Sequence, residues 1–283
     1  MRTRPTMGRE VSSRRSATRG SATRERGRPR FFVPGLTTAG STVAITGQDA
    51  RHILRVLRLG PGDEIEAVDG AGAERRGLII RAGGDEVLVM LAEGSDVCRE
   101  PSVFITILQG LPKGDKMDEV VRRNTEIGVS RFLPVVTERT VARPDPSGAA
   151  RRVQRWRRIA REASKQSGRQ RVPDVLDIMG FQEALEQVAS GTGPDASAPD
   201  DRLIIMPWEL ERARSIRDVL RERRGARDIL VFVGPEGGFS REEVGQAVAC
   251  GAVTCGLGPR ILRTETAGLV VASIILYEAG EMG

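Results

Sequence analysis

Two glycine-rich segments in the C-terminal part of the chain combine residue types that suit ligand binding. Residues 257–268, LGPRILRTETAG, gather two arginines, two threonine hydroxyls and one glutamate, which is more polar chemistry than a structural turn requires. Residues 234–240, GPEGGFS, place Glu236 in a run of glycines, which let backbone amides approach a ligand. A glutamate there repels phosphate, so the turn favours a ligand that is cationic or rich in hydroxyl and amino donors. The alternative for each glycine is a plain turn.

Neither segment matches the familiar phosphate-binding loops. A P-loop needs GxxxxGK followed by Ser or Thr, and residues 234–241 lack that lysine and hydroxyl. The dinucleotide pattern GxGxxG fails because Ile261 stands where the third glycine belongs. A nucleotide-dependent enzyme, which would bind ATP or NAD tightly, is therefore disfavoured. Ser240 and Glu243 instead predict a capping box that starts a helix.

The elements that must position these segments alternate between apolar strands and amphipathic helices. The predicted strands are 102–110, 131–136, 202–208, 228–234 and 252–258, and the predicted helices are 114–128, 153–163, 211–223, 240–250 and 265–279. This alternation predicts an α/β fold with a parallel sheet and helices on both faces. Segments that follow parallel strands meet at one edge of the sheet, so both glycine-rich segments should form one rim with MPWE (206–209).

Composition divides the chain into three parts. Residues 1–29 are predicted to be a disordered basic tail, since residues 1–30 hold ten arginines and two glutamates. The tail either helps to hold polyanions or reflects an over-extended start, with Met7 or a later codon as the true beginning. Residues 30–100, with β-like runs at 63–68, 76–81 and 86–91, predict a small β domain. Residues 101–283 form the α/β domain.

Several classes of protein are excluded by composition. The chain is 39% hydrophobic and 29% charged, as in soluble globular proteins. No apolar run approaches the roughly 20 residues that span a bilayer. Cys98, Cys250 and Cys255 lack CxxC spacing and His52 is the only histidine, so a metal site is not expected. We expect a cytoplasmic protein with reduced cysteines.

Positive charge is concentrated in residues 151–171, which carry nine Lys or Arg residues and one acid. The chain beyond residue 30, this cluster included, is near neutral, with 34 basic and 36 acidic residues. A local cluster of this kind predicts a directed polyanion contact. The alternative is a solvated helix face whose cations pair with acids of neighbouring elements.

Several long motifs, in the same order, resemble one family. They are GPEGGFS with LGPRILRTETA, KGDKMDEVVRRNTEIGV (113–129), EASKQSGRQRVP (162–173), RFFV (30–33) and HILRVLRLGPGDEI (52–65). The chain resembles the SPOUT methyltransferases, and within them the ribosomal RNA small subunit methyltransferase E family, over about residues 30–280. The resemblance implies a PUA-like β-barrel RNA-binding domain followed by a SPOUT methyltransferase domain with a C-terminal deep trefoil knot. It further implies a homodimer, with no membrane and no metal.

The same resemblance implies the reaction and its residues. S-adenosylmethionine would methylate N3 of uridine 1498 in 16S rRNA of the small ribosomal subunit. The expected cofactor-binding residues are Pro207, Gly234, Glu236, Gly237, Gly238, Leu257, Gly258, Ile261, Leu262 and Arg263. Glu265 is the candidate general base and Arg263 the candidate stabiliser of the uridine anion. Alternatively these two side chains pair with each other or across the dimer interface.

RNA contacts are expected from cations and polar groups of both domains. The candidates are Arg51, His52, Arg55, Lys113, Lys116, Arg157, Arg158, Lys165, Gln166 and Arg169. For His52, core packing is the alternative, and for Arg51 and Arg55, which recur at helical spacing, it is a solvated face. Two rival functions stay open: an RNA-binding ribosome assembly factor that retains the pocket without catalysis, and a SPOUT enzyme that acts on another rRNA or tRNA position.

Overall fold

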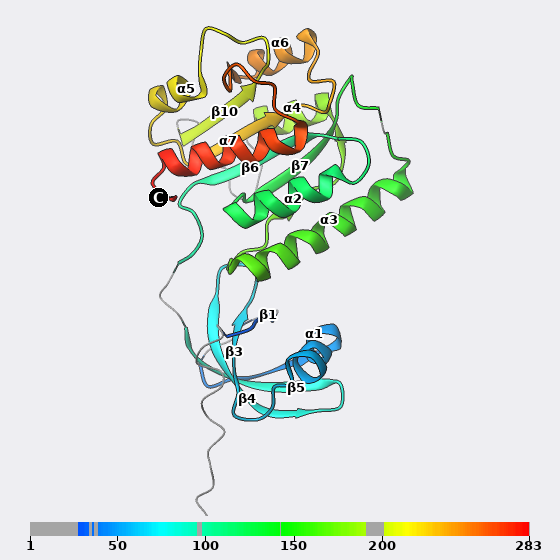
Figure 1. The fold of residues 1–283 in the computed structure, drawn as a ribbon, viewed down its shortest axis with the longest axis vertical. Helices are drawn as coiled ribbons and strands as arrows, with labels where there is room; N and C mark the ends of the chain where they lie inside the picture. The colour runs from blue at the N-terminus through cyan, green and yellow to red at the C-terminus, as the bar shows by residue number, and fades with distance from the viewer. Residues whose placement is uncertain are drawn as a thin grey trace, which may run out of the picture.

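The computed structural model describes residues 28–33, 36, 39–94, 98–141, 143–190 and 201–282. These residues form a smaller sheet near the N-terminus and a larger sheet after it. Figure 1 shows the smaller domain below the larger one, with helix α3 (Pro146–Ser167) on the side of the larger domain that faces the smaller. The predicted basic tail lies, up to residue 27, outside the described residues.

The smaller sheet has the strand order β1-β3-β4-β5-β2. Its strands are β1 (Arg30–Phe32), β2 (Thr42–Thr46), β3 (Glu64–Val68), β4 (Glu74–Gly83) and β5 (Glu86–Gly94). The predicted strands correspond to β3, β4 and β5. Strand β2 was not predicted, nor was helix α1 (Gly47–Arg51), which continues into a π-helical turn, η1 (His52–Leu57). Both helical segments are too short to show a full apolar period, and they bury only Ala50 and Ile53.

The larger sheet is parallel throughout, in the order β12-β10-β11-β6-β7-β8, with β9 also paired to β7. Its strands are β6 (Phe104–Gly110), β7 (Arg131–Val136), β8 (Asp174–Val175), β9 (Met179–Gly180), β10 (Arg202–Pro207), β11 (Asp228–Val233) and β12 (Val253–Cys255). The predicted parallel α/β sheet is confirmed. The two-residue strands β8 and β9 escaped prediction because they carry no pattern of their own.

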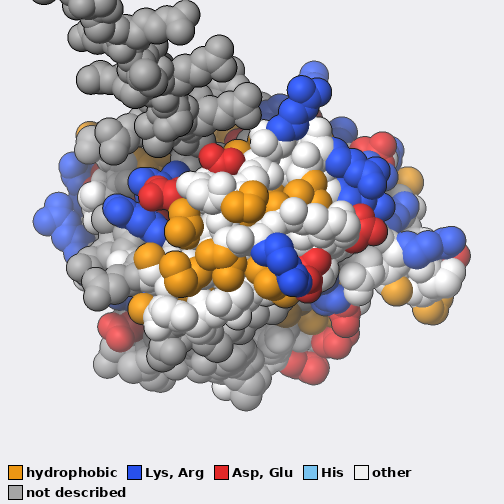
Figure 2. Space-filling view, turned by 90° about the horizontal axis from the view of Figure 1, so that it is seen from below, with side chains coloured by type: hydrophobic (Ala, Val, Ile, Leu, Met, Phe, Trp, Pro, Cys, Tyr) orange, Lys and Arg blue, Asp and Glu red, His pale blue; other side chains and the backbone are white. Residues whose placement is uncertain are grey.

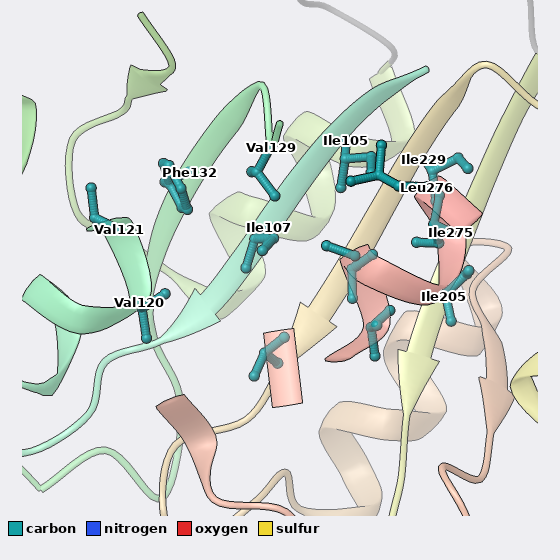
Figure 3. Close-up of a cluster of buried hydrophobic side chains, with 14 of the residues drawn as sticks. Ile105, Ile107, Val120, Val121, Val129, Phe132, Ile205, Ile229, Ile275 and Leu276 are labelled. Carbon is teal, nitrogen blue, oxygen red and sulfur yellow. The ribbon is translucent and has the colours of Figure 1, made fainter. Parts of the chain in front are cut away.

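Helices cover both faces of the larger sheet, as predicted. Besides α3 they are α2 (Lys116–Ile127), α4 (Phe181–Ser190), α5 (Ile216–Glu222), α6 (Arg241–Ala249) and α7 (Thr264–Glu278). Strand residues alternate between the two faces, so Ile105 and Ile107 join a core with α2, α3 and α7, whereas Leu108 joins a second core with α4 and α6. Figure 3 shows part of the first core, with Val120 of α2 and Ile275 of α7 on the same side of the sheet.

A network of buried charges joins the two domains. Arg30 of β1 donates to Glu74 of β4 and to the carbonyl of Gly168, which follows α3. Arg169 donates to the Glu100 carboxylate at 2.6 Å and to the backbone carbonyls of Thr125 and Val129. Only 4% of Arg169 is exposed. The prediction that Arg169 contacts RNA is therefore wrong, because its guanidinium is used inside the protein.

We expect Glu100→Gln to destabilise the full-length chain by about 3 kcal/mol, because it leaves the Arg169 cation buried without its counter-charge. Burial opposes ionisation of Glu100, but hydrogen bonds from Arg169, Arg171 and Gln170 outweigh it and lower its pKa below 4.5. The stability contributed by this carboxylate is thus fully present above pH 4.5 and lost as the pH falls through the lower folded-state pKa.

Chemical denaturation at pH 7 and pH 4 measures both effects. The matched control is Glu86→Gln, whose partner Arg81 is exposed and whose loss should cost less than about 1 kcal/mol. Equal destabilisation by the two variants would contradict a stabilising role of the buried Glu100–Arg169 pair between the domains.

Candidate active site

A cavity of about 540 Å³ lies at the carboxyl edge of the larger sheet. Most of its lining comes from the segments that follow β10, β11 and β12 and from the start of α7, and Lys116 of α2 and the ends of β10 and β11 complete it. The prediction that these strand-end segments form one rim is confirmed. All ten residues predicted to bind a cofactor line the cavity, and so does Glu265. The geometry brings them together, while their individual roles stay predictions.

The segment 234–240, called the glycine loop from here on, is held in a tight turn. Gly238 has φ of 67°, a conformation that favours glycine, and its amide donates to the carbonyl of Pro235 at 2.9 Å. The loop also packs against the end of β6, where a Cβ on Gly110 would meet Pro235 at 2.5 Å. Ser240 and Glu243 form the predicted capping box, so α6 begins directly after the loop.

A buried threonine fixes the start of α7 to the glycine loop. The Thr264 hydroxyl donates to the carbonyl of Gly234 at 2.6 Å and accepts from Gln109 Nε2 at 2.9 Å. This arrangement places Arg263 at the N-cap of α7 and Glu265 in its first turn, where the helix dipole stabilises a carboxylate. Neither Thr264 nor Gln109 was among the predicted site residues, although Thr264 lies within residues 257–268.

Arg263 and Glu265 lie close together without forming a tight pair. Their Nη1 and Oε1 atoms are 4.0 Å apart, and the side chain of Arg263 is 86% exposed while that of Glu265 is 18% exposed. Glu265 Oε2 is buried and has no hydrogen-bond partner among the described residues. A buried acceptor of this kind is costly unless something satisfies it. The exposed cation and the under-satisfied carboxylate are thus both available at the cavity.

Two other carboxylates of the cavity are held ionised by neighbours. Partial burial raises the pKa of Glu236, but Lys116, whose Nζ lies 2.7 Å from Glu236 Oε1, brings it below its usual value. The backbone amide of Ala213 and the hydroxyl of Thr254 lower the pKa of Glu211. Lys116 was predicted to contact RNA, whereas here it lines the cavity and pairs with Glu236.

Four residues that follow β10 line the cavity beside Pro207 but were not predicted individually as site residues. They are Trp208, Glu209, Glu211 and Arg212. The available signal was their position directly after a predicted strand, in and just beyond the MPWE segment. Among the described residues, no three His, Cys, Asp or Glu side chains gather in a way that could hold a metal ion.

The residues predicted to contact RNA fall into two groups. On α3, Arg157 bonds to the carbonyl of Val175 and to Asp177, and Lys165 pairs with Asp49 at 2.9 Å. Arg158 and Gln166 are exposed and have no hydrogen-bond or ion-pair partner within the described ranges. Acids of neighbouring elements therefore compensate part of the charge on α3, and the alternative interpretation of this cluster applies to that part. The arginines of α3 without an ion-pair partner among the described residues are Arg151, Arg152, Arg158 and Arg161.

The small domain presents three further candidates at its surface, while Lys113 is exposed after β6 in the larger domain. Arg51, His52 and Arg55 are exposed. The rings of His52 and Phe31 meet edge to face, with 6.1 Å between their centroids. Figure 2 views this end of the molecule and shows apolar side chains near the centre of the face, with Lys and Arg both beside them and towards the margins. Exposed apolar residues of this domain include Val56 and Ile80. The face is therefore not uniformly basic.

The prediction for α3 is that its unpaired arginine matters more for RNA than its paired one. Arg158→Gln should make the salt dependence of RNA binding shallower by about one unit of the log–log slope. Arg157→Gln should change the slope by less than half as much, because Asp177 already compensates that charge. Fluorescence anisotropy with a labelled 16S rRNA fragment at several salt concentrations measures both slopes. Equal changes would mean that the ion pair opens when RNA binds.

Comparison with known families defines the class of protein. Residues 99–276 match the RNA methyltransferase domain family, and residues 45–90 match the RNA methyltransferase PUA domain family. The chain is thus an RNA methyltransferase with an N-terminal PUA domain, and the expected fold class is confirmed. The knot remains a prediction. No helix within the described ranges is both long enough and apolar enough to span a membrane.

Individual relatives define the family more narrowly. The chain is 34% identical over 240 residues to ribosomal RNA small subunit methyltransferase E of Bacillus subtilis, covering 84% of this chain and 90% of that one. It superposes on the crystal structure of ribosomal RNA small subunit methyltransferase E from Neisseria gonorrhoeae bound to S-adenosyl methionine, with TM-score 0.77, 33% identity and coverage of 89% and 98%. A putative methyltransferase from Legionella pneumophila with bound SAM gives TM-score 0.71, 26% identity and coverage of 89% and 98%. The chain belongs to the ribosomal RNA small subunit methyltransferase E family.

Proposed function

We propose that this protein transfers the methyl group of S-adenosylmethionine to N3 of a uridine in 16S rRNA, at position 1498, in the cytoplasm. The cavity carries the proposal: three strand-end segments and the start of α7 enclose one space, with Arg263 and Glu265 in its lining. Further support is that the Neisseria gonorrhoeae relative was solved with S-adenosyl methionine.

The residues of the cavity fit S-adenosylmethionine. Carboxylates suit its sulfonium cation, and the apolar side chains of Leu257, Leu262 and Trp208 suit its adenine. Glu265 Oε2 is an acceptor without a partner among the described residues, so a donor group brought into the cavity would satisfy it. Arg263 is exposed enough to turn towards an incoming base.

In the proposed mechanism the side chains act on the acceptor. Bound S-adenosylmethionine supplies a methyl group that is already activated by its sulfonium. Uridine N3 carries a proton at neutral pH, and each unit of pKa above the working pH costs about 1.4 kcal/mol to remove it. Glu265 accepts this proton as the methyl group replaces it on N3. Arg263 donates hydrogen bonds to uracil O2 or O4, where the negative charge of the anion collects.

The target base has to leave its stack to reach this cavity, so the uridine is bound unpaired or flipped. We also propose a homodimer with α7 in its interface and the trefoil knot beside it. The support is the composition of α7, where Leu269, Val270 and Ile274 are only partly buried and Tyr277 is exposed. Light scattering from the purified chain should give the mass of two copies, and a monomer would contradict this part of the proposal.

The decisive experiment is to locate the methylated nucleotide. Small-subunit rRNA from cells with and without this gene should differ by one N3-methyluridine, at position 1498. A methyl group at another nucleotide would favour the rival SPOUT activity. Calorimetry with S-adenosylmethionine tests the other rival, a ribosome assembly factor without catalysis. The absence of binding heat would favour that factor over the methyltransferase.

A further inference from the structure

The outer side of the glycine loop is contacted by two residues from the ends of neighbouring strands. Lys113 follows β6, and its backbone amide donates to Glu236 Oε1 at 3.1 Å. Arg139 follows β7, and its Nη1 donates to the carbonyl of Gly237 at 2.8 Å. Both glycine-loop residues line the cavity, but Lys113 and Arg139 do not. The loop thus has a cavity side and an outer side, and the outer side carries two cations.

The turn that carries Arg139 is anchored on the same helix as the glycine loop. The amide of Glu138 donates to Glu243 Oε1 at 2.7 Å, while Glu243 Oε2 accepts from the amide of Ser240. The turn is closed by Thr140 Oγ1, which accepts from the amide of Thr137 at 2.9 Å. One buried glutamate therefore holds the start of α6 and the Arg139 turn together, so Arg139 keeps a fixed position relative to the cavity.

Neither of these two cations is neutralised by a side chain in the part of the chain that the structure describes. Arg139 bonds to a carbonyl rather than to a carboxylate, and Lys113 uses its backbone amide, which leaves its ammonium exposed. Lys116 already pairs with Glu236, the acid that the backbone amide of Lys113 contacts. In contrast, Arg157 and Lys165 of α3 have acidic partners. Uncompensated positive charge thus lies beside the cavity, in addition to that of unpaired arginines such as Arg158 on α3.

We propose that Lys113 and Arg139 form a phosphate-binding edge that holds the RNA backbone next to the target uridine. This inference rests on the proposed function. Neighbouring strands lie about 4.8 Å apart, so cations at the ends of β6 and β7 can contact phosphates of one strand of RNA. Arginine and lysine contacts to phosphate fix register without reading sequence. The base then enters on the cavity side of the glycine loop while the backbone stays on its outer side.

The test separates the charge of each residue from its structural contacts. Lys113→Gln keeps the backbone amide that binds Glu236, and Arg139→Gln keeps a side-chain donor for the carbonyl of Gly237. Arg224→Gln is the matched control, because Arg224 is exposed in the turn before β11, at the opposite edge of the sheet. The probes are a fluorescein-labelled single-stranded 16S rRNA fragment that contains the target uridine, titrated at several salt concentrations, and S-adenosylmethionine alone in a calorimeter.

Each of the two variants should weaken RNA binding about tenfold at low salt and reduce the salt slope by about 0.7 to 1, with the S-adenosylmethionine Kd within about threefold of wild type. The control should leave both quantities unchanged. If the wild type methylates RNA but the two variants keep its salt slope, the phosphate-binding edge is overturned and the proposed function still stands. The same holds if Arg139→Gln weakens only S-adenosylmethionine binding, since Arg139 would then merely position Gly237. A wild type that neither binds nor methylates RNA would overturn both.

Discussion

Replacing Glu265 with glutamine is expected to lower kcat by about a thousandfold, with little change in the Kd of S-adenosylmethionine. General bases contribute roughly 10²- to 10⁴-fold, and glutamine cannot accept the N3 proton. The side chain keeps its size, and its amide can still occupy the buried position of Oε2. The remaining activity should rise about tenfold per pH unit, because the uridine must then lose its proton to solvent.

Single-turnover methylation measured across pH, together with calorimetry, tests this expectation. Glu183→Gln is the control, since Glu183 is exposed in the first turn of α4, on the other face of the sheet, and should behave as wild type. A Glu265→Gln enzyme with a wild-type rate would remove Glu265 from the chemistry. A parallel loss of rate and cofactor affinity would give it a binding role instead.

Replacing Arg263 with alanine is expected to reduce kcat by about 10² to 10³, the usual effect of removing a donor that stabilises developing negative charge. The side chain is largely exposed and contacts Glu265 only at 4.0 Å, so the fold and the cavity should tolerate its loss. Because the interaction forms mainly in the transition state, kcat should fall far more than the affinity for either substrate.

Arg263→Lys should recover part of the lost rate, because the charge returns without the planar fork of the guanidinium. Arg241→Ala, at an exposed position in the first turn of α6, serves as the control and should leave kcat unchanged. If Arg263→Ala raised the Kd for S-adenosylmethionine as much as it lowered kcat, the arginine would hold the cofactor rather than the uridine anion.

Glu265 and Arg263 differ in how firmly the fold holds them, and this difference suits the separate roles proposed for them. Glu265 lies in the first turn of α7, and the neighbouring Thr264 is bonded to both β6 and the glycine loop. Its carboxylate is therefore fixed at the cavity wall. Arg263 precedes the helix and is exposed, so it can follow the base as it enters. A fixed acceptor and a movable donor suit removal of a proton followed by stabilisation of the anion.

Much of the fold and the outline of the cavity could be predicted from the sequence. Apolar strands that alternate with amphipathic helices predict a parallel sheet, and segments after parallel strands must share an edge. This rule brought 234–240 and 257–268 together without knowledge of contacts. Short elements such as β8 and helix α1 were missed, because two to five residues cannot display a period.

The sequence by itself determined which residues reach the cavity edge, since that depends on local pattern and strand direction. Only the tertiary structure decided which charges are left for RNA. Arg169 and Lys165 belong to the same basic run as Arg158, yet they bond to Glu100 and Asp49, which lie far away along the chain. Arg139 escaped notice because its contact with Gly237 joins two distant segments. Charge compensation depends on acidic partners that folding brings together, and these partners cannot be identified from the sequence of the basic run alone.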